Sequence, residues 1–217
     1  MDTSNNAKIL LAEKCVRDVD RLIGNIREIK REGITKLISA KIMEIKYSYG
    51  EPEDLVPYFS ELKKMCSRII EVLGAERWHQ RLKEMKISEL NIAHIRFCLN
   101  ILYNLDTRIN LPDDPAYAVD IRIGEIKSVM KHPRADKLKV CNVNVGRVVT
   151  VVTNIHDVKE NEKLAVALLP PTEFFGVVSE GMFASHNIKD GNPGALPELT
   201  EEELNSIRKE VLLYLRG

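Results

Sequence analysis

Apolar residues in the first half of the chain recur every three or four positions, the spacing that lines one face of an α-helix. The first stripe, formed by Ile9, Ala12, Val16, Val19, Ile23 and Ile26, predicts one helix that ends near Gly33. Further stripes predict helices at about 34–47, 53–74, 75–85 and 88–111, with Ser88 as the cap of the last. Together they predict an all-α helical domain over residues 1–111.

The pattern changes at Pro112-Asp113-Asp114-Pro115, because two prolines and two aspartates cannot continue a helix. We expect residues 112–117 to be a linker. Beyond it, apolar and polar residues alternate in five short runs, at 119–123, 138–140, 143–145, 148–152 and 164–168. The alternation slips by one position at Gly124 and again at Cys141-Asn142, which predicts β-bulges. Five short strands in so few residues predict a small closed barrel over residues 118–191.

Residues 192–217 are predicted to be an extension that ends in a helix. A stretch rich in glycine and proline runs from Asn187 to Pro197. Thr200 then opens a capping box with Glu203, which marks the N-terminus of a helix that we expect to run through Leu215.

Composition is that of an ordinary globular protein. Hydrophobic residues make up 44% and charged residues 29% of the 217 positions, which excludes a disordered chain and a disulfide-dense miniprotein. No apolar run long enough for a membrane span occurs, and the first residues show no signal-peptide pattern. We therefore expect no membrane partner and a cytoplasmic location.

Motifs for metal binding and catalysis are missing from the sequence. The cysteines (Cys15, Cys66, Cys98 and Cys141) form no Cys-x-x-Cys pair, and the histidines form no His-Glu-x-x-His motif. We expect buried free thiols, no metal site and no cofactor, with His94 as a structural histidine. Glycine-rich phosphate loops and a Gly-x-Ser-x-Gly turn do not occur either, so we expect no enzyme.

Charge is balanced overall and uneven locally. The 32 basic and 32 acidic residues give a net charge of zero. Residues 121–147 hold seven basic side chains and two acidic ones, a net charge of +5, whereas residues 148–217 carry a net charge of −5. The first of these segments is therefore a basic patch that could attract phosphate.

Five segments of the second half form a recognisable set. They are Asp120-Ile121-Arg122-Ile123-Gly124-Glu125-Ile126, Lys131-His132-Pro133-Arg134-Ala135-Asp136-Lys137-Leu138-Lys139-Val140, Val145-Gly146, Val151-Val152-Thr153-Asn154 and Gly176-Val177-Val178-Ser179-Glu180-Gly181-Met182. Together they resemble the tRNA-binding OB domain, which occurs in methionyl-tRNA synthetases, in the β-chain of phenylalanyl-tRNA synthetase and in free-standing tRNA-binding proteins. The resemblance covers about residues 118–186. It implies a five-stranded Greek-key β-barrel (OB-fold). With the helical domain and the C-terminal helix predicted from the residue pattern, the expected fold class is a two-domain α + β protein.

The resemblance also implies tRNA binding that follows the structure of the RNA rather than its sequence. The candidate contacts are Lys131, His132, Arg134, Lys137, Lys139, Asn154, Phe174, Phe175, Ser179 and Met182. The cations would pair with phosphates and the phenylalanines would stack on bases. His132 either shapes its turn or touches RNA, Ser179 and Asn154 bond either a base or their own backbone, and Met182 fills the core or contacts RNA.

Two functional hypotheses remain from the sequence. The first is a non-catalytic tRNA-binding protein, a homodimer that assists an aminoacyl-tRNA synthetase. The alternative is a protein-interaction or chaperone-like assembly module whose barrel has lost strong RNA affinity. It draws on the acidic last third and on Glu173, which stands with Phe174 and Phe175 where many relatives carry a basic segment.

Overall fold

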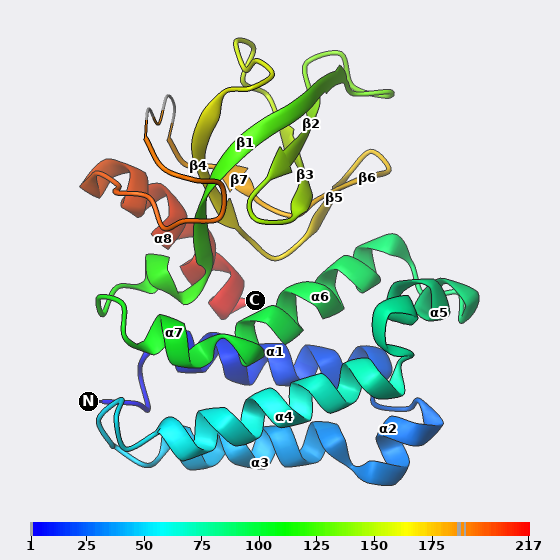
Figure 1. The fold of residues 1–217 in the computed structure, drawn as a ribbon, viewed down its shortest axis with the longest axis vertical. Coiled ribbons are helices and arrows are strands. Elements are labelled where there is room, and N and C mark those ends of the chain that lie inside the picture. The colour runs from blue at the N-terminus through cyan, green and yellow to red at the C-terminus, as the bar shows by residue number, and fades with distance from the viewer. Residues whose placement is uncertain (1, 186–187, 189) are drawn as a thin grey trace. The chain divides into compact units, whose positions relative to one another are not determined.

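The structure is a computed structural model that describes residues 2–185, 188 and 190–217 (Figure 1). It divides into two compact units, a helical unit of residues 1–118 and a barrel unit of residues 119–217. His186 and Asn187, the ends of two segments defined from the sequence, lie outside the described residues. The expected fold class, a helical domain followed by a β-barrel and a C-terminal helix, is confirmed.

The helical unit contains α1 (Ala7–Ile23), α2 (Arg27–Glu32), α3 (Ile34–Lys46), α4 (Val56–Val72), α5 (Trp78–Glu84), α6 (Glu89–Tyr103) and α7 (Leu105–Ile109), with 3₁₀ turns η1 (Ala75–Arg77) and η2 (Pro115–Ala118). Helices α1, α3, α4 and α6 each pack against two others, in the cyclic order α1, α3, α4, α6 (Figure 1). This arrangement is a four-helix bundle, which buries the apolar stripes that the sequence predicted.

The single helix expected up to Gly33 is wrong, because the chain breaks between α1 and α2. Helix α1 ends at Ile23, and Ile26 takes an extended conformation before α2 begins. Glycine and asparagine are weak helix formers, and Gly24-Asn25 stands at the break. The helical spacing of apolar residues continues past the break because Ile26, which lies in the turn, is also buried in the core.

Two further boundaries differ from the expected ones. Helix α4 begins at Val56, so Asp54 lies in the preceding turn, where its carboxylate accepts a hydrogen bond from the Glu51 amide at 3.2 Å. The helix expected over 88–111 begins at the Ser88 cap as predicted but divides at Asn104 into α6 and α7.

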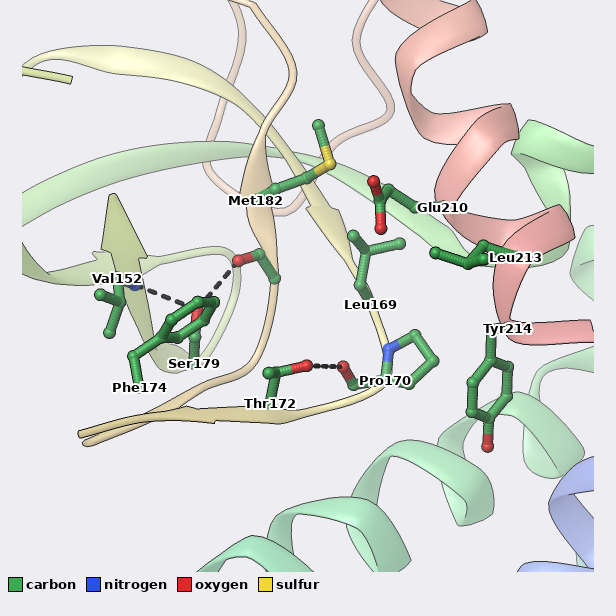
Figure 2. A pocket seen from close by; sticks show the side chains of 11 residues that line it. Val152, Leu169, Pro170, Thr172, Phe174, Ser179, Met182, Glu210, Leu213 and Tyr214 are labelled. Carbon is green, nitrogen blue, oxygen red and sulfur yellow. Dashed lines mark hydrogen bonds between the residues drawn. The ribbon is translucent and has the colours of Figure 1, made fainter. Parts of the chain in front are cut away.

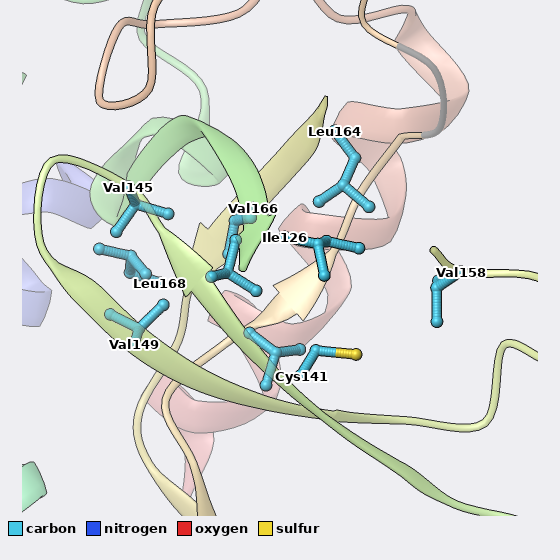
Figure 3. Packing of buried hydrophobic residues seen from close by; sticks show 10 residues of the cluster. Ile126, Cys141, Val145, Val149, Val158, Leu164, Val166 and Leu168 are labelled. Atoms are coloured by element: carbon cyan, nitrogen blue, oxygen red, sulfur yellow. The ribbon is translucent and has the colours of Figure 1, made fainter. Parts of the chain in front are cut away.

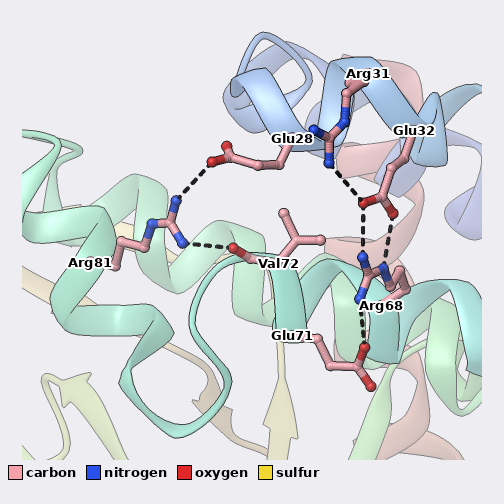
Figure 4. A network of polar contacts seen from close by, with 7 residues as sticks. All are labelled: Glu28, Arg31, Glu32, Arg68, Glu71, Val72 and Arg81. Atoms are coloured by element: carbon pink, nitrogen blue, oxygen red, sulfur yellow. Dashed lines mark hydrogen bonds and ion pairs between the residues drawn. The ribbon is translucent and has the colours of Figure 1, made fainter.

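Ion pairs tie the surface of the helical unit together (Figure 4). Arg68 on α4 bonds Glu32 with both Nε and Nη2, at 2.9 and 2.8 Å, and reaches Glu71 with Nη1 at 3.1 Å. These bonds raise the pKa of Arg68, and they lower that of Glu32. Arg81 lies 3.5 Å from Glu28. The cations of this network are thus paired with carboxylates of the same unit.

The barrel unit is built on a curled antiparallel sheet. Its strands are β1 (Asp120–Lys131), β2 (Lys139–Asn144), β3 (Val148–Thr153), β4 (Lys163–Leu168), β5 (Thr172–Phe174), β6 (Val177–Ser179) and β7 (Met182–Phe183). Over the described residues, five of them form one sheet in the order β3-β2-β1-β4-β7, and β5 pairs with β6 in a separate hairpin. The sequence pattern did not predict this hairpin.

The sheet curls round a cluster of buried aliphatic side chains, with Val143 and Val166 among its members (Figure 3). At the open edge, Thr150 of β3 accepts a hydrogen bond from the Glu180 amide at 2.8 Å. Gly181 brings this segment close to β4, because a Cβ there would collide with the carbonyl oxygen of Ala167. The glycine of the Ser-x-Gly-Met motif therefore serves the closure of the barrel.

The bulge expected at Gly124 is wrong. The alternation of apolar residues slips there because β1 buries one face before Gly124 and the opposite face after it. Ile126 points into the barrel, and Gly124, two residues earlier, points to the same side. A Cβ at Gly124 would lie 2.6 Å from methyl groups of Val143 and Val166, so only glycine fits. Ile123 points to the other side, where its Cδ1 lies against Gly191 of the C-terminal tail.

The register shift of the sheet lies at Lys127 instead. Strand β1 pairs with β2 continuously except between Ile126 and Ser128. Strand β2 pairs with β3 without interruption, so the bulge expected at Cys141-Asn142 is also wrong. The extra residue is Lys127 of β1, and it lies opposite Asn142 and Val143 of β2.

The C-terminal extension completes the barrel unit. Gly194 donates its amide to the Ile123 carbonyl, and Ala195 accepts from the Ile123 amide, each at 2.8 Å, so the tail continues the free edge of β1. Helix α8 (Glu201–Arg216) follows, and both halves of the predicted Thr200–Glu203 capping box are present. The predicted terminal helix is therefore confirmed.

All four cysteines lie in the described part of the chain and are buried free thiols, as expected. Burial raises the pKa of Cys66 to about 12 and that of Cys141 to about 11. Among the described residues, no helix has the length and apolar character needed to cross a membrane.

Candidate nucleic-acid interface

His132 fastens the loop between β1 and β2 to the β5–β6 hairpin. Its Nδ1 accepts a hydrogen bond from the Arg134 amide at 3.1 Å, so Nε2 carries the proton and donates to the Phe174 carbonyl oxygen at 2.9 Å. The side chain is buried, with 5% of its residue surface exposed. Of the two roles left open by the sequence, this geometry favours the one in which His132 shapes the loop.

The tip of the hairpin lies against the same loop. Phe175 and Gly176 form the tip with positive φ angles of 47° and 90°. The rings of Phe175 and His132 meet edge to face, with centroids 6.2 Å apart. A Cβ at Gly176 would lie 3.3 Å from Nη1 of Arg134, which places the guanidinium over the turn. Phe175 is 65% exposed, so an aromatic face and a guanidinium are presented side by side.

Three cations of the loop have no acidic partner. Lys131, Arg134 and Lys137 are exposed, and none forms an ion pair with any carboxylate in residues 2–185, 188 or 190–217. The other cations of the basic patch are paired differently. Arg122 lies near Asp120, Lys127 binds Glu125, Arg147 binds Glu180, and Lys139 donates to the backbone carbonyl of His156. The loop therefore presents three exposed cations close together that no described carboxylate neutralises.

Lys131 and Lys139 stand directly opposite each other in the β1–β2 ladder. Like charges at opposed positions destabilise a sheet. The opposed lysines therefore add two positive charges to this end of the ladder, and Lys139 also donates to the His156 carbonyl.

An apolar pocket of about 360 Å³ opens next to this loop. It is lined by Leu138, Val152, Thr153, Asn154, Ile155, Phe174, Met182 and Phe183. No charged side chain of the described residues lines the pocket. The two neighbours of the lining residue Leu138 in the sequence, Lys137 and Lys139, are cations. A flat apolar group with an anionic tether matches this combination of surfaces.

A second pocket, of about 420 Å³, lies between the barrel and α8 (Figure 2). It shares Val152, Phe174 and Met182 with the first, so the two are parts of one groove. Its α8 side carries Glu210, Leu213 and Tyr214. The acidic side chain and the distance along the groove from the basic loop make this end less suited to phosphate.

Glu173 points away from the pocket side of the hairpin. Successive side chains of a strand project to opposite faces. Thr172 and Phe174 line the groove, so Glu173 between them projects to the other face. Its carboxylate therefore does not face the group that enters the groove.

The ten candidate residues fall into distinct places. Asn154, Phe174 and Met182 line the apolar pocket, while the four cations and Phe175 surround the loop and hairpin tip. Ser179 is buried: its Oγ accepts from the Val152 amide and donates to the Gly181 carbonyl oxygen, each at 3.0 Å. Its hydroxyl therefore serves the backbone.

Sequence reasoning missed part of the pocket wall, namely Leu138, Val152, Ile155 and Phe183. One signal was present. Leu138 is an apolar residue between two lysines, where a merely solvated loop would carry a polar side chain. Val152 and Phe183 belong to strands and Ile155 follows β3, and their exposure at one rim of the barrel depends on its curvature.

Comparisons with known proteins agree with this site. Residues 121–203 match the family described as "Putative tRNA binding domain", so the resemblance noted in the sequence is confirmed. The barrel unit thus contains a tRNA-binding domain. The chain as a whole belongs to the family described as "Alpha helical domain", whose match covers residues 1–112. Sequence reasoning had identified no family for the helical unit.

The relatives match only part of this chain. The chain is 44% identical over 72 residues to the phenylalanine–tRNA ligase beta subunit of Moorella thermoacetica, covering 29% of this chain and 9% of that protein. It is 34% identical over 92 residues to the methionine–tRNA ligase of Bacteroides fragilis, covering 39% and 14%. It is 36% identical over 74 residues to "Putative tRNA-binding protein YtpR" of Bacillus subtilis, covering 29% and 37%. The match thus spans 9% to 37% of these relatives' own lengths.

Proposed function

We propose that this chain is a non-catalytic tRNA-binding protein that holds RNA through the β1–β2 loop, the β5–β6 hairpin tip and the adjoining apolar pocket. The observation that carries the proposal is the set of three exposed loop cations without acidic partners, fastened by His132 to the hairpin that carries Phe175. The tRNA-binding domain matched over residues 121–203 supports the same ligand.

The loop cations would bind the phosphate backbone. Lys131, Arg134, Lys137 and Lys139 offer ammonium and guanidinium groups on one rim of the barrel, and each phosphate that they neutralise releases a condensed counterion. Such contacts orient the RNA without reading its bases. This mechanism explains binding that follows tRNA structure and weakens with salt.

The apolar surfaces would hold unpaired bases. Phe175 presents its ring to solvent, and Phe174, 37% exposed, forms a wall of the pocket with Met182. Asn154 is exposed at the pocket and can bond a base edge through its amide. Stacking on an aromatic side chain contributes about 1–3 kcal/mol for each base.

Binding of bulk tRNA by the full chain, measured by filter retention across a salt series, tests this function. We expect dissociation constants in the micromolar range or tighter at low salt and a log–log salt slope of about −3 to −4, from roughly one unit per loop cation. Absence of retention, or binding that does not change with salt, would reject the proposal.

We further propose that the protein assists an aminoacyl-tRNA synthetase in the cytoplasm and acts as a homodimer. The support is the names of two relatives, which are tRNA ligases. Affinity purification after nuclease treatment should recover a synthetase less well than purification with RNA intact. Light scattering at tens of micromolar should give twice the chain mass of 24.7 kDa, and the monomer mass would contradict the dimer.

The interaction-module hypothesis has lost one of its supports. It depended on Glu173 repelling phosphate, and that side chain projects to the face of the hairpin opposite the groove. Efficient recovery of a protein partner from nuclease-treated extracts, combined with no tRNA binding, would restore it.

A further inference from the structure

Two adjacent helices of the bundle bring together four side chains that bind transition metals. Helix α1 carries Cys15 and Asp18, and α6 carries His94 and Cys98. Residues three or four apart lie one above the other on a helix face, so each helix presents one pair. Helices α1 and α6 pack against each other. The two pairs therefore meet at one helix–helix contact.

Three of these four side chains have their ligand atoms close together. Asp18 Oδ2 lies 3.1 Å from His94 Nε2. The ligand atoms of Asp18, His94 and Cys98 all lie within 4.8 Å of one another. Donor atoms around a tetrahedral zinc ion stand roughly 3–4 Å apart, given metal–ligand lengths of about 2.0–2.3 Å. The cluster needs only small side-chain movements to reach that geometry.

Cys15 offers a fourth donor beside the three. Its thiol is fully buried and interacts with that of Cys98, which in turn interacts with His94, although Cys15 lies outside the group of three within 4.8 Å. The chemical set is then two thiols, one imidazole and one carboxylate. Side-chain exposures of 18% for Asp18 and 16% for His94 leave an entrance for an ion at the surface, while both sulfurs stay inside.

We propose that Asp18, His94, Cys98 and Cys15 form a zinc site that fastens α1 to α6. Zinc is the metal of choice because thiolate and imidazole are its common ligands in proteins, and four side chains complete its tetrahedral shell. Asp18 is already oriented from outside, since its Oδ1 lies 3.2 Å from Nη2 of Arg21. Such outer contacts hold a ligand in place for the metal.

His94 and Cys98 both have raised pKa values in the absence of metal. Burial lowers the pKa of His94, but hydrogen bonds to Asp18 and Cys98 outweigh it and raise the pKa to about 9. Burial raises the pKa of Cys98 well above its usual value. Zinc binds the neutral imidazole and the thiolate, so binding is expected to release protons.

This site differs from the proposed RNA surface in location and in chemistry. It belongs to the helical unit and contains none of the residues offered to tRNA. Metal binding is thus expected to change the stability of the bundle and to leave the salt slope of RNA binding unaltered. The two proposals can fail separately.

The test is zinc binding to the full chain, kept reduced and first stripped of metal. Calorimetry should give one zinc per chain with a dissociation constant below a micromolar, and repeating it in buffers of different ionisation enthalpy should show that binding releases protons. Cobalt(II) as a probe should give a thiolate-to-cobalt charge-transfer band and the intense visible absorption of tetrahedral coordination.

Variants separate the site from general thiol binding. Asp18→Asn, His94→Ala and Cys98→Ser should each weaken zinc binding by at least tenfold, and Cys98→Ser should weaken the charge-transfer band. Cys66→Ser is the matched control, since Cys66 is a buried thiol on α4 outside the cluster, and it should bind zinc as the parent does.

Three results would overturn the site. They are no zinc binding by the reduced parent up to about a hundred micromolar, zinc binding unchanged in both Asp18→Asn and His94→Ala, and a cobalt spectrum without a thiolate band. Asp18 is partly exposed, so its asparagine variant keeps the test decisive if a cysteine variant fails to fold.

Discussion

The ion-paired cations of the helical unit and the cations of the β1–β2 loop have opposite surroundings. In the helical unit, Arg68 holds two carboxylates and Lys41 bonds both Glu44 and Glu61 at 2.7 Å. In the loop, Lys131, Arg134 and Lys137 hold no carboxylate of the described residues. A paired cation is neutralised within its own fold, whereas an unpaired one attracts an anion from outside. The difference indicates which surface meets the phosphate backbone, although the chain as a whole is neutral.

Removing the loop cations should have the largest effect. In a variant with Lys131, Arg134, Lys137 and Lys139 all replaced by alanine, we expect tRNA affinity at low salt to fall by about two orders of magnitude. The log–log salt slope should fall by about three units, since each contact accounts for a little under one. Different tRNAs should be affected alike, because phosphates carry no base information.

The matched control removes four paired cations from the helical unit: Lys41, Lys46, Lys63 and Arg68. Its net charge changes by the same amount. Circular dichroism establishes that both variants are folded before filter binding. Equal losses of affinity in the two would show that total charge matters and pairing does not.

Phe175→Ala should have the next largest effect. Loss of one stacked base lowers affinity by about 1–3 kcal/mol and leaves the salt slope unchanged, because no counterion is involved. Tyr49→Ala is the control, since Tyr49 is also aromatic, 60% exposed and at a positive φ of 52°, but belongs to the helical unit. If Phe175→Ala lowers the melting temperature and not the affinity, the ring serves the fold alone.

His132→Ala should weaken tRNA binding by releasing the β1–β2 loop from the hairpin. It removes a hydrogen-bond partner from the Phe174 carbonyl and from the Arg134 amide, at a cost of about 1–3 kcal/mol in the free energy of unfolding. Hydrogen exchange at the Arg134 amide should accelerate, and tRNA affinity should fall several-fold with the salt slope retained. His156→Ala, at an exposed histidine, should change neither. Unchanged exchange at Arg134 would mean that His132 does not hold the loop.

Arg68→Ala is expected to have the smallest effect. Exposed ion pairs contribute little, so the melting temperature should fall by no more than about 3 °C and tRNA affinity should stay the same. Thermal scans and filter binding check both values. A marked loss of affinity would extend the RNA surface to the helical unit and break the comparison.

Local features of the fold were predictable from the sequence. The Thr200–Glu203 capping box and the Ser88 cap are set by neighbours along the chain, and the structure contains both. The alternating runs predicted β1 to β4, but the runs at 138–140 and 143–145 belong to the single strand β2, and β7 was not predicted. The break after Gly24 escaped prediction because Ile26 kept the apolar spacing from within a turn. The slip at Gly124 was misread because the C-terminal tail covers the outer face of β1, a contact between distant segments.

The candidate site was predictable in its residue types and less so in its geometry. Charge counting located the basic loop, but the absence of acidic partners for Lys131 and Lys137 depends on the folded surface. The bond from His132 to Phe174 joins residues 42 positions apart. Asp18 and His94 are likewise 76 positions apart, so spacing motifs could not reveal their cluster. Such pairings follow from packing rather than from local pattern.

The central claim is that the unpaired loop cations contact tRNA, and lysine acetylation of the unmodified protein tests it most directly. A limiting amount of acetylating reagent, followed by mass spectrometry, gives the reaction rate of each lysine with and without saturating tRNA. We predict that tRNA slows the acetylation of Lys131 and Lys137 at least several-fold and leaves Lys41 and Lys63 of the helical unit unchanged. Equal rates at Lys131 and Lys137 with and without bound tRNA would contradict the claim.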